Sequence, residues 1–118
     1  MQFDTTQELL QYAQSKQLFV PLVEQVIKDF ALIGVVLSIP KPWETKAFSQ
    51  RLTEKLYLLI MEQNREYVNL LYRMDIPEKE LGPYQSDTVE EAQRMTLIVL
   101  NRALRKVQFR TKEGNQHF

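Results

Sequence analysis

Glu62 and Glu66 are the side chains whose type and spacing come closest to catalytic chemistry. They stand four residues apart in a helical pattern, so both carboxylates project from the same side of the helix. Partial burial beside the apolar face could raise a pKa and make either an acid–base pair or a site for a hard cation. Such pairs are common on helix surfaces, and we favour the alternative that both are solvated or paired with Arg65, Arg73 or a basic residue of the last helix.

The remaining side chains argue against an enzyme. The sequence has no cysteine, which excludes disulfides, thiolate nucleophiles and thiolate metal ligands, and its one histidine is His117, next to the C-terminal residue. A metal site would have to be all-oxygen, and the Glu-x-x-His motif of carboxylate di-metal bundles is absent. No Gly-rich phosphate loop or serine elbow is present. We therefore assign no catalytic, cofactor-binding or metal-binding residue.

Gln63 is a polar residue inside an apolar helical stripe. A buried amide that finds no hydrogen-bond partner costs free energy, so Gln63 must either bond across the helices or line a pocket. We favour the first alternative, in which it fixes the register of the packing. In the second alternative Gln63, Glu66 and Tyr67 line a pocket for a small ligand.

The elements that must position these residues are predicted from composition first. The chain has 118 residues, enough for one domain, and 15 Lys and Arg balance 15 Asp and Glu, so no global charge bias indicates a polyanion or a membrane surface. No secretory signal precedes the first helical pattern, and the longest apolar run, residues 30–39, is half the roughly 20 residues that span a bilayer. We expect a soluble, cytoplasmic protein. Few glycines and prolines favour helix.

Helix boundaries follow from capping residues. Thr5 with Glu8 predicts a helix to about residue 16, and Pro21 opens a second helix that Gly34 stops. The residues that follow mix β-branched side chains with prolines and predict an extended connection. Asp87 has Glu90 three residues later, which predicts the start of the last helix, with Val89 in its apolar stripe and an end near Phe109.

Between these helices, residues 43–74 predict one long helix of about 45 Å that ends before Pro77. A single helical turn at residues 77–82 follows. The predicted fold class is all-α, an irregular four-helix bundle around one long central helix. Residues 1–112 form a single domain in this prediction, and residues 113–118 a flexible tail.

The long helix carries two apolar stripes. The core stripe consists of residues three and four positions apart: Phe48, Leu52, Leu56, Leu59, Ile60, Gln63, Tyr67, Leu70, Leu71 and Met74. A second stripe, Tyr57, Met61, Val68 and Tyr72, is rotated from it by roughly 100° to 180°. Either the chain's other helices cover both stripes, which is the favoured alternative, or the second stripe meets another chain, most simply a second copy.

The last helix carries a basic face. Five side chains lie roughly opposite its apolar stripe: Arg94, Arg102, Arg105, Lys106 and Arg110. They could form a strip for nucleic acid or for an acidic protein partner. Acidic residues at a helix start and basic residues at its end also stabilise the helix through its macrodipole, and this simpler explanation is favoured.

These observations predict a non-enzymatic interaction or scaffolding protein that self-associates through the second stripe. The partner is expected to be a second copy or another protein, and nucleic acid is possible but not favoured. The alternatives are nucleic-acid binding through the basic face and small-ligand binding in the bundle.

Overall fold

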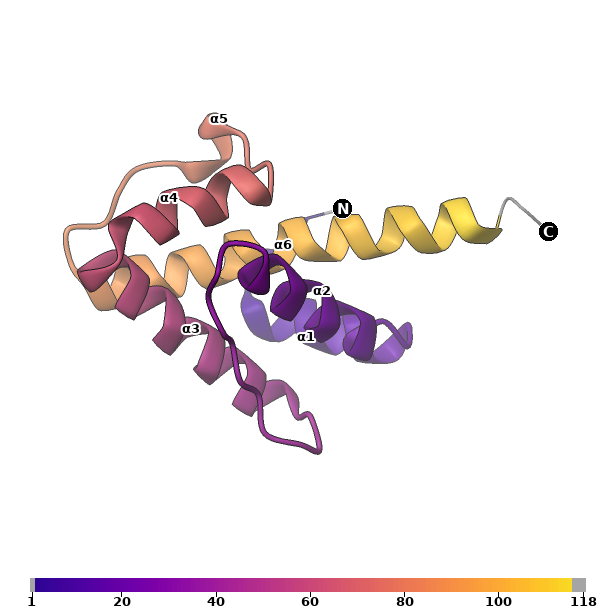
Figure 1. The fold of residues 1–118 in the computed structure, drawn as a ribbon. Coiled ribbons are helices and arrows are strands. Elements are labelled where there is room, and N and C mark those ends of the chain that lie inside the picture. The colour runs from indigo at the N-terminus through magenta and orange to yellow at the C-terminus, as the bar shows by residue number, and fades with distance from the viewer. Residues whose placement is uncertain (1, 116–118) are drawn as a thin grey trace.

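The structure is a computed structural model, and it describes residues 2–115 (Figure 1). Helices make up all the regular structure in this range, which confirms the prediction of an all-α fold. Six helices are present: α1 (Thr6–Ser15), α2 (Phe19–Ala31), α3 (Thr45–Glu62), α4 (Asn64–Arg73), α5 (Glu78–Leu81) and α6 (Thr88–Asn115).

The predicted caps of α1 and α6 are present, whereas α2 begins at Phe19, two residues before the predicted start at Pro21. The backbone N–H of Glu8 donates to Thr5 Oγ1 at 3.1 Å, and that of Glu90 donates to Asp87 Oδ1 at 3.0 Å. Each bond satisfies one of the amide groups that the first turn of a helix leaves without an intrahelical partner. The starts of α1 and α6 are therefore set by the residues that the sequence indicated.

Gly34 ends α2 as predicted, with a φ of 80° that glycine adopts without a side-chain clash. The N–H of Val35 donates to Phe30 O at 3.0 Å and the N–H of Gly34 to Ala31 O at 3.0 Å, which is the Schellman arrangement. Two other helix ends have the same arrangement without glycine, at Gln17 (φ 59°) and Asp75 (φ 55°).

The prediction of one long helix over residues 43–74 is wrong. Gln63, with φ −135° and ψ 60°, separates α3 from α4. A continuous helix from Thr45 to Arg73 would be about 44 Å long. The molecule is 46 Å long only along the direction of α6, and its other two dimensions are 31 and 28 Å (Figure 1). Since α3 crosses α6 (Figure 1), a continuous helix in its direction would extend beyond the packed core. The break lets α4 turn back and bury Leu70 and Met74 in the same core.

The central helix is α6, and α1, α2, α3 and α5 all pack against it. Its 28 residues continue to Asn115 rather than ending near Phe109, and its C-terminal end extends past the other helices (Figure 1). Residues 113–115 of the expected tail are thus helical in their backbone. Residues 116–118, with His117, lie outside the described residues.

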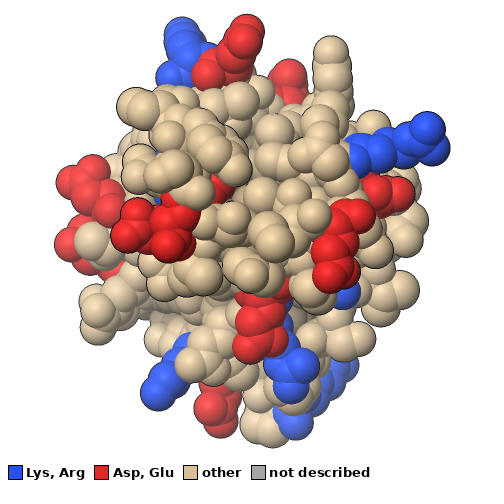
Figure 2. All heavy atoms as spheres, turned by 90° about the vertical axis from the view of Figure 1, so that its left-hand side faces the viewer, with Lys and Arg blue, Asp and Glu red and all other residues tan. Residues whose placement is uncertain are grey.

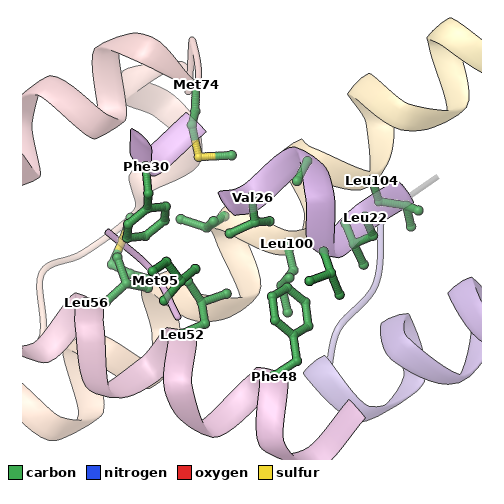
Figure 3. Close-up of a cluster of buried hydrophobic side chains, with 14 of the residues drawn as sticks. Leu22, Val26, Phe30, Phe48, Leu52, Leu56, Met74, Met95, Leu100 and Leu104 are labelled. Carbon is green, nitrogen blue, oxygen red and sulfur yellow. The ribbon is translucent and has the colours of Figure 1, made fainter. Parts of the chain in front are cut away.

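The core lies where α2, α3 and α6 meet. Phe30 and Leu56 face Met95 in it, and Phe48 lies near Leu100 (Figure 3). Full burial of each such side chain stabilises the fold by about 1.5–3 kcal/mol relative to exposure. Six members of the predicted core stripe are buried: Phe48, Leu52, Leu56, Leu59, Leu70 and Met74.

The connection between α2 and α3 is extended, as predicted. Val35 and Leu37 are buried, whereas Val36 between them is 75% exposed. This alternation is the one an extended chain produces, because successive side chains point to opposite sides. The connection therefore covers part of the core without pairing as a strand within the described residues.

Asp29 of α2 is a charged residue with no exposed surface. Its Oδ2 accepts hydrogen bonds from Gln25 Nε2 at 3.1 Å and from Lys106 Nζ at 3.3 Å, and Arg73 Nε lies 3.6 Å from its Oδ1. Lys106 belongs to α6 and Arg73 to α4. The carboxylate thus connects three helices through two opposite charges, which offset part of the cost of its burial, while its Oδ1 accepts no hydrogen bond within the described residues.

Candidate interaction surfaces and the groove between α3 and α6

A groove of about 790 Å³ lies between α3 and the first half of α6. Residues of α3 and α6 make up most of its lining, and Thr6 at the start of α1 completes it. Its lining combines hydroxyl and amide groups with four apolar side chains: Thr6, Ser49, Gln50, Thr53, Glu54, Tyr57, Leu58, Val89, Ala92, Gln93 and Thr96.

The helices that form the groove are joined by a hydroxyl pair. Thr53 Oγ1 and Thr96 Oγ1 are 2.7 Å apart, and the Thr96 hydroxyl is also 2.8 Å from Ala92 O. If Thr96 donates its proton to that carbonyl, Thr53 is the donor of the pair. The only carboxylate in the lining is Glu54, so the groove does not bring two carboxylates together as an acid–base pair.

Leu58 and Val89 lie among the groove residues and are 43% and 51% exposed. The prediction that Val89 belongs to the buried stripe of the last helix is therefore wrong. Val89 lies in the first turn of α6, beyond the point where α3 covers that face. Nothing in the sequence alone could identify this groove, because it depends on which face of α3 meets α6.

A smaller groove of about 480 Å³ adjoins the first and lies between α1 and α3. The two share Thr6, Ser49 and Gln50. The remaining lining is polar apart from one leucine, and it includes three glutamines of α1, namely Gln7, Gln11 and Gln14. The apolar side chains of the two adjoining grooves are thus concentrated in the groove next to α6.

The second stripe is divided by the break at Gln63. Tyr57 and Met61 lie on α3, and Val68 and Tyr72 lie on α4. Tyr57 is half-buried in the groove, whereas Met61, Val68 and Tyr72 are 56%, 43% and 84% exposed. The described residues of this chain therefore leave three of the four side chains uncovered, contrary to the favoured expectation that its own helices cover both stripes.

Gln63 is not in the core. It is exposed at the junction of the two helices, so its amide neither fixes register inside the core nor lines either groove. Glu62 is exposed and Glu66 half-buried. No ion pair joins these two carboxylates to Arg65, Arg73 or a basic residue of α6 among the described residues, so of the two favoured alternatives, solvated or paired, the pairing is not seen there.

Tyr67, another of the pocket candidates, is half-buried near the carboxylate of Glu91. Burial, with a smaller contribution from the nearby Glu91 carboxylate, raises the pKa of the Tyr67 phenol to about 12. Glu91 is itself buried. Burial acts to raise the pKa of Glu91, but hydrogen bonds from Arg94 and from the backbone of Gln85 outweigh it, so that pKa lies below its ordinary value.

The predicted basic face is largely engaged within the chain. Arg105 makes two hydrogen bonds to the Glu80 carboxylate, at 2.9 and 3.2 Å, which lower the pKa of Glu80. Arg102 Nε donates to Met74 O at 2.7 Å. Arg102 also lies 3.4 Å from Asp75 Oδ2, Arg94 contacts Glu91 and Leu81 O, and Lys106 contacts Asp29. Arg110 is exposed. Nucleic-acid binding stays a prediction, but four of its five side chains already have partners.

Metal binding and membrane crossing have no support in the described part of the chain. No group of three or more His, Cys, Asp or Glu side chains gathers there in an arrangement suited to a metal ion. No helix in the same residues has both the length and the apolar character needed to cross a bilayer.

Charge is unevenly placed at one end of the molecule, where α3 passes into α4 and α6 begins. Seen from that end, uncharged atoms occupy the centre and acidic side chains lie around them, whereas basic side chains lie toward the margin (Figure 2). An uncharged centre of this kind can contact another protein without leaving charges unpaired.

Comparison with protein-family models, with curated proteins and with solved structures finds no match to this chain. The geometry and chemistry of its surfaces are therefore the basis on which function is inferred.

Proposed function

We propose that the protein is a non-enzymatic interaction protein that associates with a second copy of itself through exposed apolar side chains of α3 and α4. The observation that carries the proposal is the exposure of Met61, Val68 and Tyr72. Exposed apolar side chains on neighbouring elements are typical of surfaces that meet another protein. Tyrosine and methionine suit such a surface, because each contributes a large contact area and tolerates imperfect fit.

A second copy is the simplest partner for two reasons. Most oligomers are two-fold dimers in which the same surface is used by both subunits. The chain also carries 15 basic and 15 acidic residues, so two copies do not repel each other through net charge.

The test is the solution mass at micromolar concentration, measured by sedimentation equilibrium or light scattering. The wild type is expected at twice the mass of the 14.0 kDa chain. Replacing Met61→Gln and Tyr72→Gln together should weaken the dimer by about tenfold or more, because buried aromatic side chains carry much of the energy of an interface. Both side chains are exposed in the monomer, so the fold should be unaffected.

Val20→Gln is the matched control. Val20 is 51% exposed and lies on α2, outside the second stripe. Its replacement should leave the dissociation constant unchanged. A wild type that stays monomeric at high concentration would rule out self-association, and a dimer equally strong in the double variant would place the interface elsewhere.

A second candidate function is the binding of a small, partly apolar ligand in the α3–α6 groove. The groove volume of about 790 Å³ falls within the range of small-molecule sites, roughly 300–1,000 Å³. A fluorescent apolar probe such as anilinonaphthalene sulfonate should bind the wild type. It should bind less well to Leu58→Arg and Val89→Arg, whereas Met61→Gln should behave as wild type. Unchanged binding to the arginine variants would place the probe outside the groove.

A further inference from the structure

The connection between α4 and α6 is held to the molecule by polar contacts rather than by a buried core. From residue 75 to residue 90, not one side chain is buried. Ile76 and Leu81 pack against the core only in part. Segments with little buried apolar area open locally at a lower free energy than the fold as a whole. We therefore expect residues 75–86, the connecting segment, to open at a lower free energy than the packed core of α1, α2, α3 and α6.

Three arginines of α6 hold the connecting segment in place. Arg105 binds the Glu80 carboxylate with both terminal nitrogens, Arg94 donates to Leu81 O, and Arg102 lies 3.4 Å from Asp75 Oδ2. Arg102 also donates to the carbonyl oxygen of Met74, which lies just before the connecting segment and is buried in the core. We call Arg94, Arg102 and Arg105 the arginine clasp. Their spacing of eight and three residues places them on one face of α6.

The same face of α6 also has apolar positions. Ile98 lies between Arg94 and Arg102, and Phe109 lies one turn beyond Arg105. Phe109 is 68% exposed, and Ile98 is half-buried. Detachment of the connecting segment would thus present a helix face that alternates guanidinium groups with apolar side chains.

We propose that the arginine clasp is a binding surface for an acidic, partly apolar peptide segment of a partner protein, and that the connecting segment occupies this surface as an internal competitor. The connecting segment defines the chemistry that fits. It offers carboxylates from Glu80 and Asp75, backbone carbonyl oxygens, and the apolar side chains of Ile76 and Leu81. Bidentate contact between a guanidinium group and a carboxylate is geometrically selective. A peptide that alternates carboxylates with apolar side chains can therefore replace the connecting segment.

A peptide fits this surface better than nucleic acid does. Glu91 is bound to Arg94, and it stays on α6 when the connecting segment leaves. Lys106 remains paired with Asp29 in the core. A nucleic acid backbone carries a continuous row of phosphates, so it would be repelled by the Glu91 carboxylate beside Arg94 and could not pair with Lys106. A peptide requires only isolated contacts between its carboxylates and the arginines.

The test adds the competitor back as a separate molecule. The probe is a labelled peptide with the sequence of residues 74–82, MDIPEKELG, and the receptor is the full chain carrying Asp75→Asn and Glu80→Gln. Removing the internal carboxylates lowers the competition, so the variant should bind the peptide about tenfold more tightly than the wild type. Adding Arg105→Gln to the variant should abolish this gain, and binding should weaken with salt.

Two controls separate competition from a general change in charge or fold. Glu78→Gln removes an exposed carboxylate that makes no ion pair among the described residues, and it should bind the peptide as the wild type does. A peptide with asparagine and glutamine in place of its residues matching Asp75 and Glu80 should not bind. Thermal unfolding of each variant confirms that the core is intact.

Equal affinity of wild type and double variant for the peptide would overturn the proposal, as would binding that survives Arg105→Gln. A rise in mass of the double variant without peptide would assign the surface to a second copy and overturn a partner peptide. If an oligonucleotide bound in a way that requires Arg105 and the peptide did not bind, the arginine clasp would be a nucleic-acid site, and the peptide proposal would be wrong. The Met61→Gln, Tyr72→Gln variant should bind the peptide as the wild type does, so this test is independent of the proposed dimer.

Discussion

Gln17 and Asp75 hold left-handed backbone conformations that glycine adopts more readily than they do. Each ends a helix, and each N–H completes a hydrogen bond that a straight continuation would not make. Their side chains are exposed, and that of Asp75 lies near Arg102, whereas that of Gln17 makes no hydrogen bond or ion pair among the described residues. The steric cost of the left-handed conformation at Gln17 is therefore offset by backbone hydrogen bonds alone, and glycine could make the same bonds without that cost.

Gln17→Gly should raise the free energy of unfolding by about 0.5–1 kcal/mol, because relief of the steric cost exceeds the added entropy of the unfolded chain. Denaturant unfolding measures the change. Gln14→Gly, on the exposed side of α1, is the control and should lower stability by about 0.5–1 kcal/mol. A loss of stability at both positions would contradict the explanation.

Tyr67 gives the fold a dependence on alkaline pH. Its folded-state pKa of about 12 lies above the value of 10.0 for an unburied tyrosine, so the folded protein holds the phenolic proton more tightly than the unfolded chain does. The stability from Tyr67 is complete below pH 10 and is lost as the pH rises toward 12. Tyr67→Phe should remove this part of the slope, measured by urea unfolding between pH 9 and 11. An unchanged slope would contradict the assignment.

At the scale of helices, the boundaries set by local chemistry could be predicted and the break at Gln63 could not. Thr5, Gly34 and Asp87 act through bonds to residues close in sequence, so the signal is local. Leu59 of α3 and Leu70 of α4 are eleven residues apart, close to three helical turns. The apolar pattern therefore runs through the break without a change of phase, and no glycine or proline marks it.

Of the candidate interaction surfaces, the second stripe could be predicted in part from the sequence, whereas the groove and the arginine clasp could not. The position of Met61 and Tyr72 on a second stripe could be predicted from their angular spacing, but their exposure is contrary to the favoured expectation that the other helices cover both stripes. The groove and the arginine clasp depend on contacts between residues of α6 and residues far from them in sequence, such as Thr96 with Thr53 and Arg105 with Glu80. One sequence contains no signal of those pairings.

Asp87→Ala should destabilise the start of α6 by about 1 kcal/mol, because it removes the side-chain acceptor for the Glu90 amide. Ser86→Ala, one residue earlier and also exposed, makes no such bond and is the control. Amide hydrogen exchange should show the loss in the first turn of α6. Equal effects of the two substitutions would show that the cap bond contributes nothing.

Across the whole molecule, Asp29 joins α2, α4 and α6 through one buried carboxylate. Lys106→Met should lower the free energy of unfolding by about 2–4 kcal/mol, because it leaves that carboxylate buried with a single, more distant cation. Asp29→Asn should cost less, since Lys106 and Arg73 are partly exposed and can turn to solvent. Lys28→Met, on an exposed position of α2, is the control and should change stability by less than about 0.5 kcal/mol. The reverse order of the two core variants would contradict this account.

The central position of α6 also has a consequence for synthesis in the cell. The ribosome makes α1 to α5 before the helix against which most of them pack, and domains fold only once their contacting elements have emerged. Until then, the apolar faces formed by Leu22, Val26 and Leu56 lack the cover that α6 provides. The nascent chain should therefore remain sensitive to protease and attractive to chaperones until α6 has left the exit tunnel. Its folding is expected to be delayed rather than progressive during translation.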